Sequence, residues 1–520
     1  MYIDGKILIG KNLNKELFIV PSMANRHGLI TGASGSGKTI TLKVMAESFS
    51  SMGVPVFLSD IKGDLSGTCM PGESNEKIEE RLNSIGIENF EFKGFPVVFW
   101  DVFKKSGHPI RTSIQSVGAT ILSRMLGLND TQEAVLAVIF KIAKEEGYEI
   151  IDIKDLRIIL QYVSENSKEY TVKYGNVATQ SIGSIQRSLI ALEEQGGDDF
   201  FGEPAIDIKD FFNFNDKGLG NINILHCVEL YKNPNLYACF LLWILSTLNS
   251  NLPEVGDMDK PKMVFFFDEA HLLFDNLPSY ILTSVIQIVK LIRSKGVGLY
   301  FISQSPNDIP EQILAQLGNK IQHNLRAYTP AEQRAINAIS DSFRANPEFD
   351  TKQAILSLGT GEALISFLNE KGEPNIVEKA TILPPQSMMG EVDEPLRLMV
   401  ISRSIFHGKY DTVIDRESAF EILSEEIENK KAEEEAIKRE KEEQKLLAQK
   451  QKEEDRIRRE EIREQREADR IKKQEEREAE KARKNSIEYK IGKAAGRVGN
   501  AALSTIGRKA ANELFKNLFK

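Results

Sequence analysis

The chain has 520 residues, of which 41% are hydrophobic, enough for a large buried core, and its net charge of −9 excludes a broadly basic nucleic-acid-binding protein. It has no run of about 18 apolar residues and no signal-peptide pattern, so we expect a cytoplasmic protein without a membrane-spanning helix. The three cysteines are too scattered for a metal site or a disulfide framework, and Cys227 lies in an apolar run typical of a core.

A complete phosphate-loop motif, GxxxxGK[ST], lies near the start of the chain between a short apolar run and a helical pattern. Its glycines let the backbone fold tightly so that N–H groups face phosphate oxygens. Lys38 is expected to reach the β- and γ-phosphates of ATP, and Thr39 to hold Mg²⁺. The residues predicted to bind nucleotide are Gly32, Ala33, Ser34, Gly35, Ser36, Gly37, Lys38 and Thr39.

Short apolar runs alternate with helical patterns from the N-terminus to about residue 410. The runs are 53–60, 95–101, 221–230, 262–269 and 296–304. Because each is bounded by Gly, Pro or polar residues, they fit buried parallel strands joined by helical crossovers. After the first run, Asp60, Lys62 and Asp64 in "LSDIKGDLSG" either face the nucleotide edge of the sheet or form a polar turn, and the sequence leaves both readings open.

Residues 104–217 are mostly helical in pattern and are predicted to be an insertion between two parts of an α/β core, 1–103 and 218–410. The clearest helix is 129–147, which has Asn129 and Asp130 as possible caps, Asp130 with Glu133 in a capping arrangement, and Gly147 at its end. Its expected apolar face comprises Leu136, Ile139, Phe140 and Ala143.

The run "MVFFFDEAH" predicts a buried strand that ends at two carboxylates, Asp268 and Glu269. Ligands of open α/β sheets bind at the carboxyl ends of strands. We therefore expect Asp268 to hold Mg²⁺ through its water shell and Glu269 to act as general base on the attacking water. His271 either couples nucleotide state to ligand binding or caps the following helix.

Three polar residues around the strand 296–304 complete the predicted catalytic set. Gln304 ends that strand, where an amide can contact the γ-phosphate or orient water. Arg293 precedes the strand and Arg326 follows it in "HNLRAYTP". Either arginine is a candidate arginine finger for a neighbouring subunit.

The composition changes after the core. Residues 415–485 are rich in acid–base pairs at i,i+4 and lack Gly and Pro, which predicts a long charged helix. Its few apolar residues do not keep a heptad register, which favours a solvated single helix over a coiled coil. Residues 486–520 predict a basic amphipathic helix that either docks on a partner protein, a membrane surface or nucleic acid or packs back on the protein's own core.

Five motifs occur in an order that resembles the HerA–FtsK superfamily of P-loop ATPases. They are "GASGSGKT", "FFFDEAH", "IRSKGVGLYFISQSPNDIP", "LGNKIQHNLRAYTPAEQRA" and "LGTGEALISFL". Within it, the chain is most similar to bacterial HerA-like ATP-binding proteins with a charged helical tail. The letters "DEAH" do not indicate a DEAH-box helicase, because the gap after the phosphate loop is too long and leaves no room for a second RecA-like domain.

The resemblance implies a RecA-like core with a helical insertion, assembled as a hexameric ring that couples ATP hydrolysis to movement on duplex DNA. It implies that Arg293 and Arg326 act in trans and that Gly361 and Glu362 lie near a subunit boundary. A nucleotide-switched assembly or coupling ATPase, working through its C-terminal helices, is the alternative.

Overall fold

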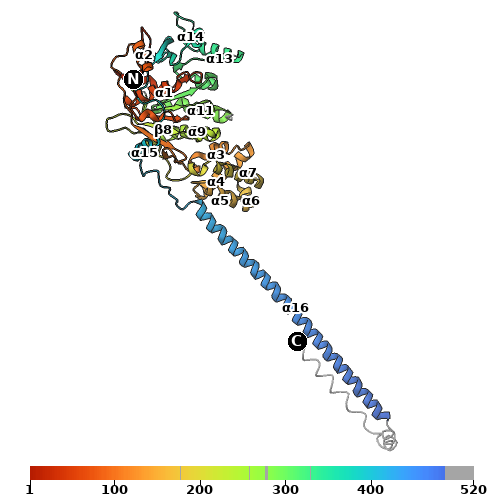
Figure 1. Ribbon diagram of the computed structural model, residues 1–520. Coiled ribbons are helices and arrows are strands. Elements are labelled where there is room, and N and C mark those ends of the chain that lie inside the picture. The colour runs from red at the N-terminus through yellow and green to blue at the C-terminus, as the bar shows by residue number, and fades with distance from the viewer. Residues whose placement is uncertain (176, 257, 276–278, 328, 486–520) are drawn as a thin grey trace, which may run out of the picture. The chain divides into compact units, whose positions relative to one another are not determined.

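The computed structural model describes residues 1–175, 177–256, 258–275, 279–327 and 329–485 (Figure 1). The chain divides into two units, Met1–Ile427 and the part from Glu428 onward. The first unit contains every strand described below. The described part of the second unit is the continuation of one long helix, α16 (Ala419–Asn485).

The first unit is built on one sheet of 13 strands. Its order is β1-β2-β13-β12-β11-β4-β10-β9-β5-β8-β6-β7, with β3 paired to β2. The strands are β1 (Tyr2–Ile3), β2 (Lys6–Lys11), β3 (Glu16–Ile19), β4 (Gly28–Thr31), β5 (Val56–Asp60), β6 (Val97–Asp101), β7 (His108–Pro109), β8 (Ile222–His226), β9 (Met263–Phe267), β10 (Val297–Ser303), β11 (Asn319–Gln322), β12 (Glu362–Ser366) and β13 (Glu378–Ile382).

The sheet has a parallel part and an antiparallel part. From β11 to β7 every neighbouring pair is parallel, and this part contains all five predicted strands as β5, β6, β8, β9 and β10. The strand of the phosphate loop, β4, lies between β10 and β11. The fold is therefore the expected α/β core, in which a central parallel strand leads into the phosphate loop. The antiparallel extension from β12 to β1 was not among the predicted strands.

The described chain also forms helices, of which α1 packs on one face of the sheet and α9 and α11 pack on the other (Figure 1). They are α1 (Lys38–Ser51), α2 (Glu76–Ile85), α3 (Ile114–Met125), α4 (Asp130–Glu146), α5 (Ile153–Glu165), α6 (Ser167–Tyr174), α7 (Thr179–Glu194), α8 (Gly197–Phe200), α9 (Pro234–Asn251), α10 (His271–Phe274), α11 (Ser279–Ile292), α12 (Glu311–Leu314), α13 (Pro330–Asp341), α14 (Thr351–Ser357), α15 (Glu394–Ser402) and α16. Short 3₁₀ turns are η1 (Pro21–Arg26), η2 (Ser66–Cys69), η3 (Ile208–Phe212), η4 (Leu230–Lys232), η5 (Arg293–Lys295) and η6 (Pro306–Asp308).

Strand β9 shows why its sequence is apolar at every position. Phe265 and Phe267 belong to a core shared with α9 and α11, whereas Val264 and Phe266 belong to a second core shared with α1. Successive side chains of a strand point to opposite faces, so a strand covered on both sides must be apolar throughout. Cys227 is buried in the first core, as expected.

The region predicted as an insertion contains α3 to α8. In α4, Leu136, Ile139 and Ala143 are buried as expected, whereas Phe140 is only half-buried. Val135 and Ile142 are buried as well, and Gly147 ends the helix in the left-handed conformation. The predicted capping pair was wrong: Asn129 is the cap, and its side chain and that of Gln132 bond each other's backbone N–H groups. Asn129 takes the extended backbone that a cap needs, whereas Asp130 is already helical.

The first turns of α16 belong to the core of the first unit. Ala419, Leu423 and Ile427 are buried there, and Ser418 donates a hydrogen bond to Asp155 of α5. Beyond Glu428 the described apolar residues of α16 are exposed: Ile437, Leu446, Leu447, Ile457, Ile462 and Ile471. The predicted basic helix 486–520 lies outside the described residues.

Within the part of the chain that the structure describes, no helix is both long enough and apolar enough to cross a membrane.

Candidate nucleotide-binding and active site

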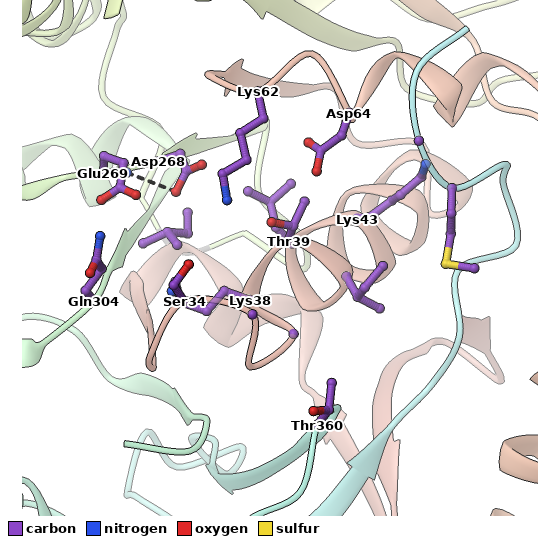
Figure 2. Close-up of a pocket in the computed structure, with 17 residues that line it drawn as sticks. Ser34, Lys38, Thr39, Lys43, Lys62, Asp64, Asp268, Glu269, Gln304 and Thr360 are labelled. Atoms are coloured by element: carbon purple, nitrogen blue, oxygen red, sulfur yellow. Dashed lines mark hydrogen bonds between the residues drawn. The ribbon is translucent and has the colours of Figure 1, made fainter. Parts of the chain in front are cut away.

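The phosphate loop connects the end of β4 to the start of α1. Gly35 and Gly37 have φ values of +75° and +114°, which residues with a Cβ rarely adopt. Lys38 donates hydrogen bonds to the carbonyls of Gly32 (2.7 Å) and Ala33 (3.2 Å). The loop borders a pocket of about 350 Å³ at the carboxyl ends of the parallel strands (Figure 2).

A buried histidine braces the phosphate loop from the side away from this pocket. His323 follows β11, and its ring nitrogens lie 2.8 Å from Thr41 Oγ1 and 2.9 Å from the Glu362 carbonyl oxygen. Burial lowers the pKa of His323 to about 4, so the ring is neutral at neutral pH. The adjacent Asn324 accepts a hydrogen bond from Ala33 N (2.8 Å) through its backbone carbonyl. These contacts tie the loop to the antiparallel side of the sheet.

The buried, neutral His323 predicts that the stability of the protein depends on pH. Unfolded His323 takes up a proton as the pH falls below about 6.5, whereas the folded residue resists protonation down to about 4. This residue therefore contributes stability at pH 7 that is lost between about pH 6.5 and 4, with a slope of up to about 1.4 kcal/mol per pH unit.

We expect His323→Gln to be less stable than the wild type at pH 7, by about 1–3 kcal/mol, because Thr41 and Glu362 lose a partner. We also expect its stability to fall less steeply between pH 6.5 and 4. Urea unfolding at several pH values measures both effects. His407→Gln, at an exposed histidine, is the matched control, and an unaltered pH slope in His323→Gln would contradict the assignment.

Asp268 is positioned at the end of β9 by its neighbours on β5 and α9. Its backbone N donates to Ser59 Oγ (3.2 Å), and the Tyr237 hydroxyl lies 2.9 Å from both Ser59 Oγ and the Asp268 carbonyl oxygen. Burial, together with the charge of the adjacent Glu269, raises the pKa of Asp268 to about 6, although the hydrogen bond from the Glu269 N–H and the charges of Lys62 and Lys38 oppose the shift. These bonds fix the backbone of Asp268, and its side chain lines the edge of the pocket.

Glu269 has an unusual backbone and an incompletely bonded carboxylate. Its φ of +45° places a non-glycine residue in the left-handed region, and its N–H donates to Asp268 Oδ1 (2.9 Å; Figure 2). Its buried Oε2 accepts no hydrogen bond within the described chain but lies 3.3 Å from His271 Nδ1. His271 therefore contacts Glu269, and Ala270, not His271, is the cap of α10.

The lysine of the loop and the two carboxylates share the pocket. Burial lowers the pKa of Lys38, and the negative charges of Glu269 and Asp268 oppose that shift. Gln304, which follows β10, also lines the pocket. The strands β9 and β10 are directly paired, which explains why the residues that follow them meet.

The oxygen donors here fit Mg²⁺. Thr39 supplies a hydroxyl at the first turn of α1, and Asp268 supplies a carboxylate across the same pocket. Magnesium prefers oxygen ligands and keeps several waters, so two protein ligands plus phosphate oxygens suffice. When bound with ATP, the ion neutralises charge on the phosphates.

The sequence left open whether Asp60, Lys62 and Asp64 face the nucleotide edge of the sheet or form a polar turn, and the turn after β5 answers this. Asp60 is buried and holds the turn, since it accepts hydrogen bonds from Gly63 N (2.7 Å) and Leu65 N (3.1 Å). Burial and the charge of Asp64 raise the pKa of Asp60 to about 7. Lys62 and Asp64 instead line the pocket. Both readings thus hold, each for different residues.

The two arginines lie in different places. Arg326 borders a cavity that also contains Ala33, Ser34, His271 and Gln304, so it lies beside this chain's own phosphate loop. Arg293 is in η5, before the amino end of β10, and is therefore at the edge of the sheet opposite Gln304. The fold does not bring Arg293 to this chain's own pocket.

Several pocket residues escaped the sequence analysis because they come from distant segments: Lys43, Thr360, Met389 and Gly390. Gly361 donates a hydrogen bond to the Ser36 carbonyl (3.0 Å), and Arg81 of α2 bonds the carbonyls of Thr360 and Gly361. The resemblance of "LGTGEAL" implies a subunit boundary at Gly361 and Glu362, and its contact with the phosphate loop follows only from the structure.

Comparison with known proteins identifies the family of this chain. Residues 6–510 match the family "Helicase HerA-like C-terminal". The DNA double-strand break repair helicase HerA of Sulfolobus acidocaldarius is 25% identical over 393 residues, covering 74% of this chain and 69% of that protein. The protein of the same name from Sulfurisphaera tokodaii is 26% identical over 377 residues, covering 70% and 67%.

Two solved structures are also similar. The plasmid coupling protein TrwB in complex with an ATP analogue has a TM-score of 0.49 at 12% identity, covering 71% of this chain and 88% of that one. VirB4 of Thermoanaerobacter pseudethanolicus has a TM-score of 0.47 at 16% identity, covering 76% and 99%. The family match spans nearly the whole chain, and its site contains a phosphate loop with two carboxylates. This protein is therefore a P-loop ATPase that belongs to the Helicase HerA-like C-terminal family.

Proposed function

We propose that this ATPase is a ring-shaped motor, a homohexamer that moves along duplex DNA as a translocase or helicase. The observation that carries the proposal is the convergence of Lys38, Asp268, Glu269 and Gln304 on one pocket at the carboxyl edge of the sheet. DNA as the substrate is supported by the relatives, which are named DNA double-strand break repair helicases.

The pocket supports a division of labour for hydrolysis. Lys38 and the backbone N–H groups of the loop hold the phosphates, and Thr39 and Asp268 hold Mg²⁺. Glu269 takes a proton from the attacking water, for which its buried and incompletely bonded Oε2 is suited. Gln304 orients that water or contacts the γ-phosphate.

Ring formation would bring a neighbouring subunit to this edge. Arg326 is placed to act on nucleotide in its own subunit, because its cavity includes Ser34 and Gln304. Arg293, at the opposite edge of the sheet, is the better candidate for a role in trans. Gly361 and Glu362 remain candidates for a subunit boundary.

The motor proposal predicts that duplex DNA raises the rate of ATP hydrolysis. Hydrolysis should be measured without nucleic acid and with duplex DNA, single-stranded DNA or RNA, over a range of salt, because phosphate contacts weaken as salt increases. We expect duplex DNA to stimulate most. If it fails to raise turnover at any salt concentration, the DNA motor proposal is wrong, although the ATPase assignment is not.

The same assay distinguishes the second candidate, a nucleotide-switched assembly or coupling ATPase that works through its C-terminal helices. This candidate is favoured by the long exposed helix after Glu428. The chain should be ended after Ile427, because Ala419, Leu423 and Ile427 are part of the first core. Without the part of α16 after Ile427, a motor should keep DNA-stimulated turnover, whereas an assembly factor should keep basal turnover and lose its partner.

A further inference from the structure

A second lysine points into the nucleotide pocket and has no role in the mechanism described so far. Lys62 lies in the turn after β5, on a wall of the pocket other than the phosphate loop, and its amine points toward the centre of the pocket (Figure 2). The turn is rigid, since Asp60 bonds two of its N–H groups and Ser66 Oγ donates to the Gly63 carbonyl (3.0 Å). The backbone of Lys62 is therefore held in place before any ligand binds.

The charge of Lys62 is not neutralised by an ion pair. No carboxylate of the described residues lies within ion-pairing distance of its amine. Its amine shares the pocket with the Lys38 amine and the Asp268 carboxylate (Figure 2), and its charge adds to the lowering of the Lys38 pKa and opposes the raising of the Asp268 pKa. Two lysines that repel each other across a half-buried pocket are stabilised when an anion lies between them.

The position of Lys62 identifies which part of the anion it contacts. The phosphate loop holds the inner phosphates, with Lys38 reaching toward the β- and γ-phosphates. Asp268 and Glu269 mark the opposite end, where the terminal phosphate and the attacking water meet. Figure 2 shows the Lys62 amine pointing toward the space between Asp268 and Thr39, the part of the pocket where the terminal phosphate would lie.

We propose that Lys62 is a second phosphate-binding lysine, which contacts the γ-phosphate of ATP and stabilises the charge that develops there during hydrolysis. This assignment rests on the proposed ATP site. It makes Lys62 a sensor of ATP against ADP, because ADP has no phosphate at that position. Loss of the γ-phosphate would remove the partner of the amine, while the turn that carries Lys62 stays held by Asp60 and Ser66.

The test is equilibrium binding of Mg·ATP and Mg·ADP to the full chain in a Glu269→Gln background, where ATP is turned over slowly. Because a charge-assisted hydrogen bond is worth a factor of about 10 or more in affinity, we expect Lys62→Ala to weaken Mg·ATP binding about 10-fold and Mg·ADP binding far less. Lys62→Arg should restore part of the preference for ATP. Lys105→Ala, at an exposed lysine on another loop at this edge of the sheet, is the control and should change neither affinity.

Equal weakening of Mg·ATP and Mg·ADP binding would overturn the assignment, because it would indicate a general electrostatic effect. Unchanged binding of both nucleotides would also overturn it. If the Glu269→Gln parent itself fails to bind Mg·ATP, the proposed nucleotide site is wrong, and the role assigned to Lys62 is wrong as well. These outcomes distinguish failure of the lysine assignment from failure of the site.

Discussion

Glu269→Gln is expected to hydrolyse ATP about 10²–10⁴-fold more slowly than the wild type while still binding it, the range typical for loss of a general base. The amide keeps the size and shape of the carboxylate but cannot accept a proton from water. The left-handed backbone of Glu269 and its hydrogen bond to Asp268 do not depend on the side-chain charge, so the pocket should keep its form. Steady-state phosphate release and equilibrium nucleotide binding measure the two properties separately.

A control for Glu269→Gln is available near the same edge of the sheet. Glu311 begins α12 after β10 and is exposed outside the pocket, so Glu311→Gln should leave turnover unchanged. If Glu269→Gln hydrolyses ATP at close to the wild-type rate, Glu269 is not the base. The water would then have to be activated by another group, and Asp268 would be the next to test.

Gly32→Ala should destabilise the protein more than Gly35→Ala, although both positions belong to the same phosphate loop and have positive φ values. A Cβ at Gly32 would lie 2.5 Å from the Cβ of His323, whereas a Cβ at Gly35 would meet nothing within 4 Å. His323 cannot yield, because both its ring nitrogens and its backbone N–H are bonded. Gly35→Ala is left with backbone strain alone, about 1–2 kcal/mol.

In Gly32→Ala, we expect the clash with His323 to lower the free energy of unfolding by roughly 1–3 kcal/mol in addition to the effect of backbone strain. Urea unfolding without nucleotide measures the difference between the two variants. Gly32→Ala should also bind ATP much more weakly, because the Gly32 carbonyl that holds Lys38 must shift. Equal stability of the two variants would show that His323 does not brace the loop in solution.

The sequence predicted those parts of the site that are formed by residues close together in the chain. The phosphate loop is one continuous motif, and Asp268 with Glu269 ends an apolar run whose pattern indicates a buried strand. The positions of these residues follow from a general property of parallel sheets, whose carboxyl edges collect the loops that bind ligands. The capping pair of α4 was the exception: both Asn129 and Asp130 suit a cap, and only the backbone conformation decides between them.

The positions of the two arginines and the pairing of the antiparallel strands could not be predicted from the sequence. Both arginines were equally good candidates in the sequence. In the fold, Arg293 precedes the amino end of β10, whereas Arg326 follows the carboxyl end of β11 and lies near the phosphate loop. Strand β2 pairs with β13, which comes more than 300 residues later, so no local pattern identifies either as the other's partner.

By itself, the sequence determined that this protein has a buried parallel α/β core, a phosphate loop and a carboxylate pair, since each depends on residues close together in the chain. Only the tertiary structure decided that His323 and Gly361 brace the loop, that Asp60 holds the turn, and that Lys62 enters the pocket. The physical reason is that these contacts join segments that the sheet brings together across long stretches of chain, and such pairings leave no periodic signal in the residues that form them.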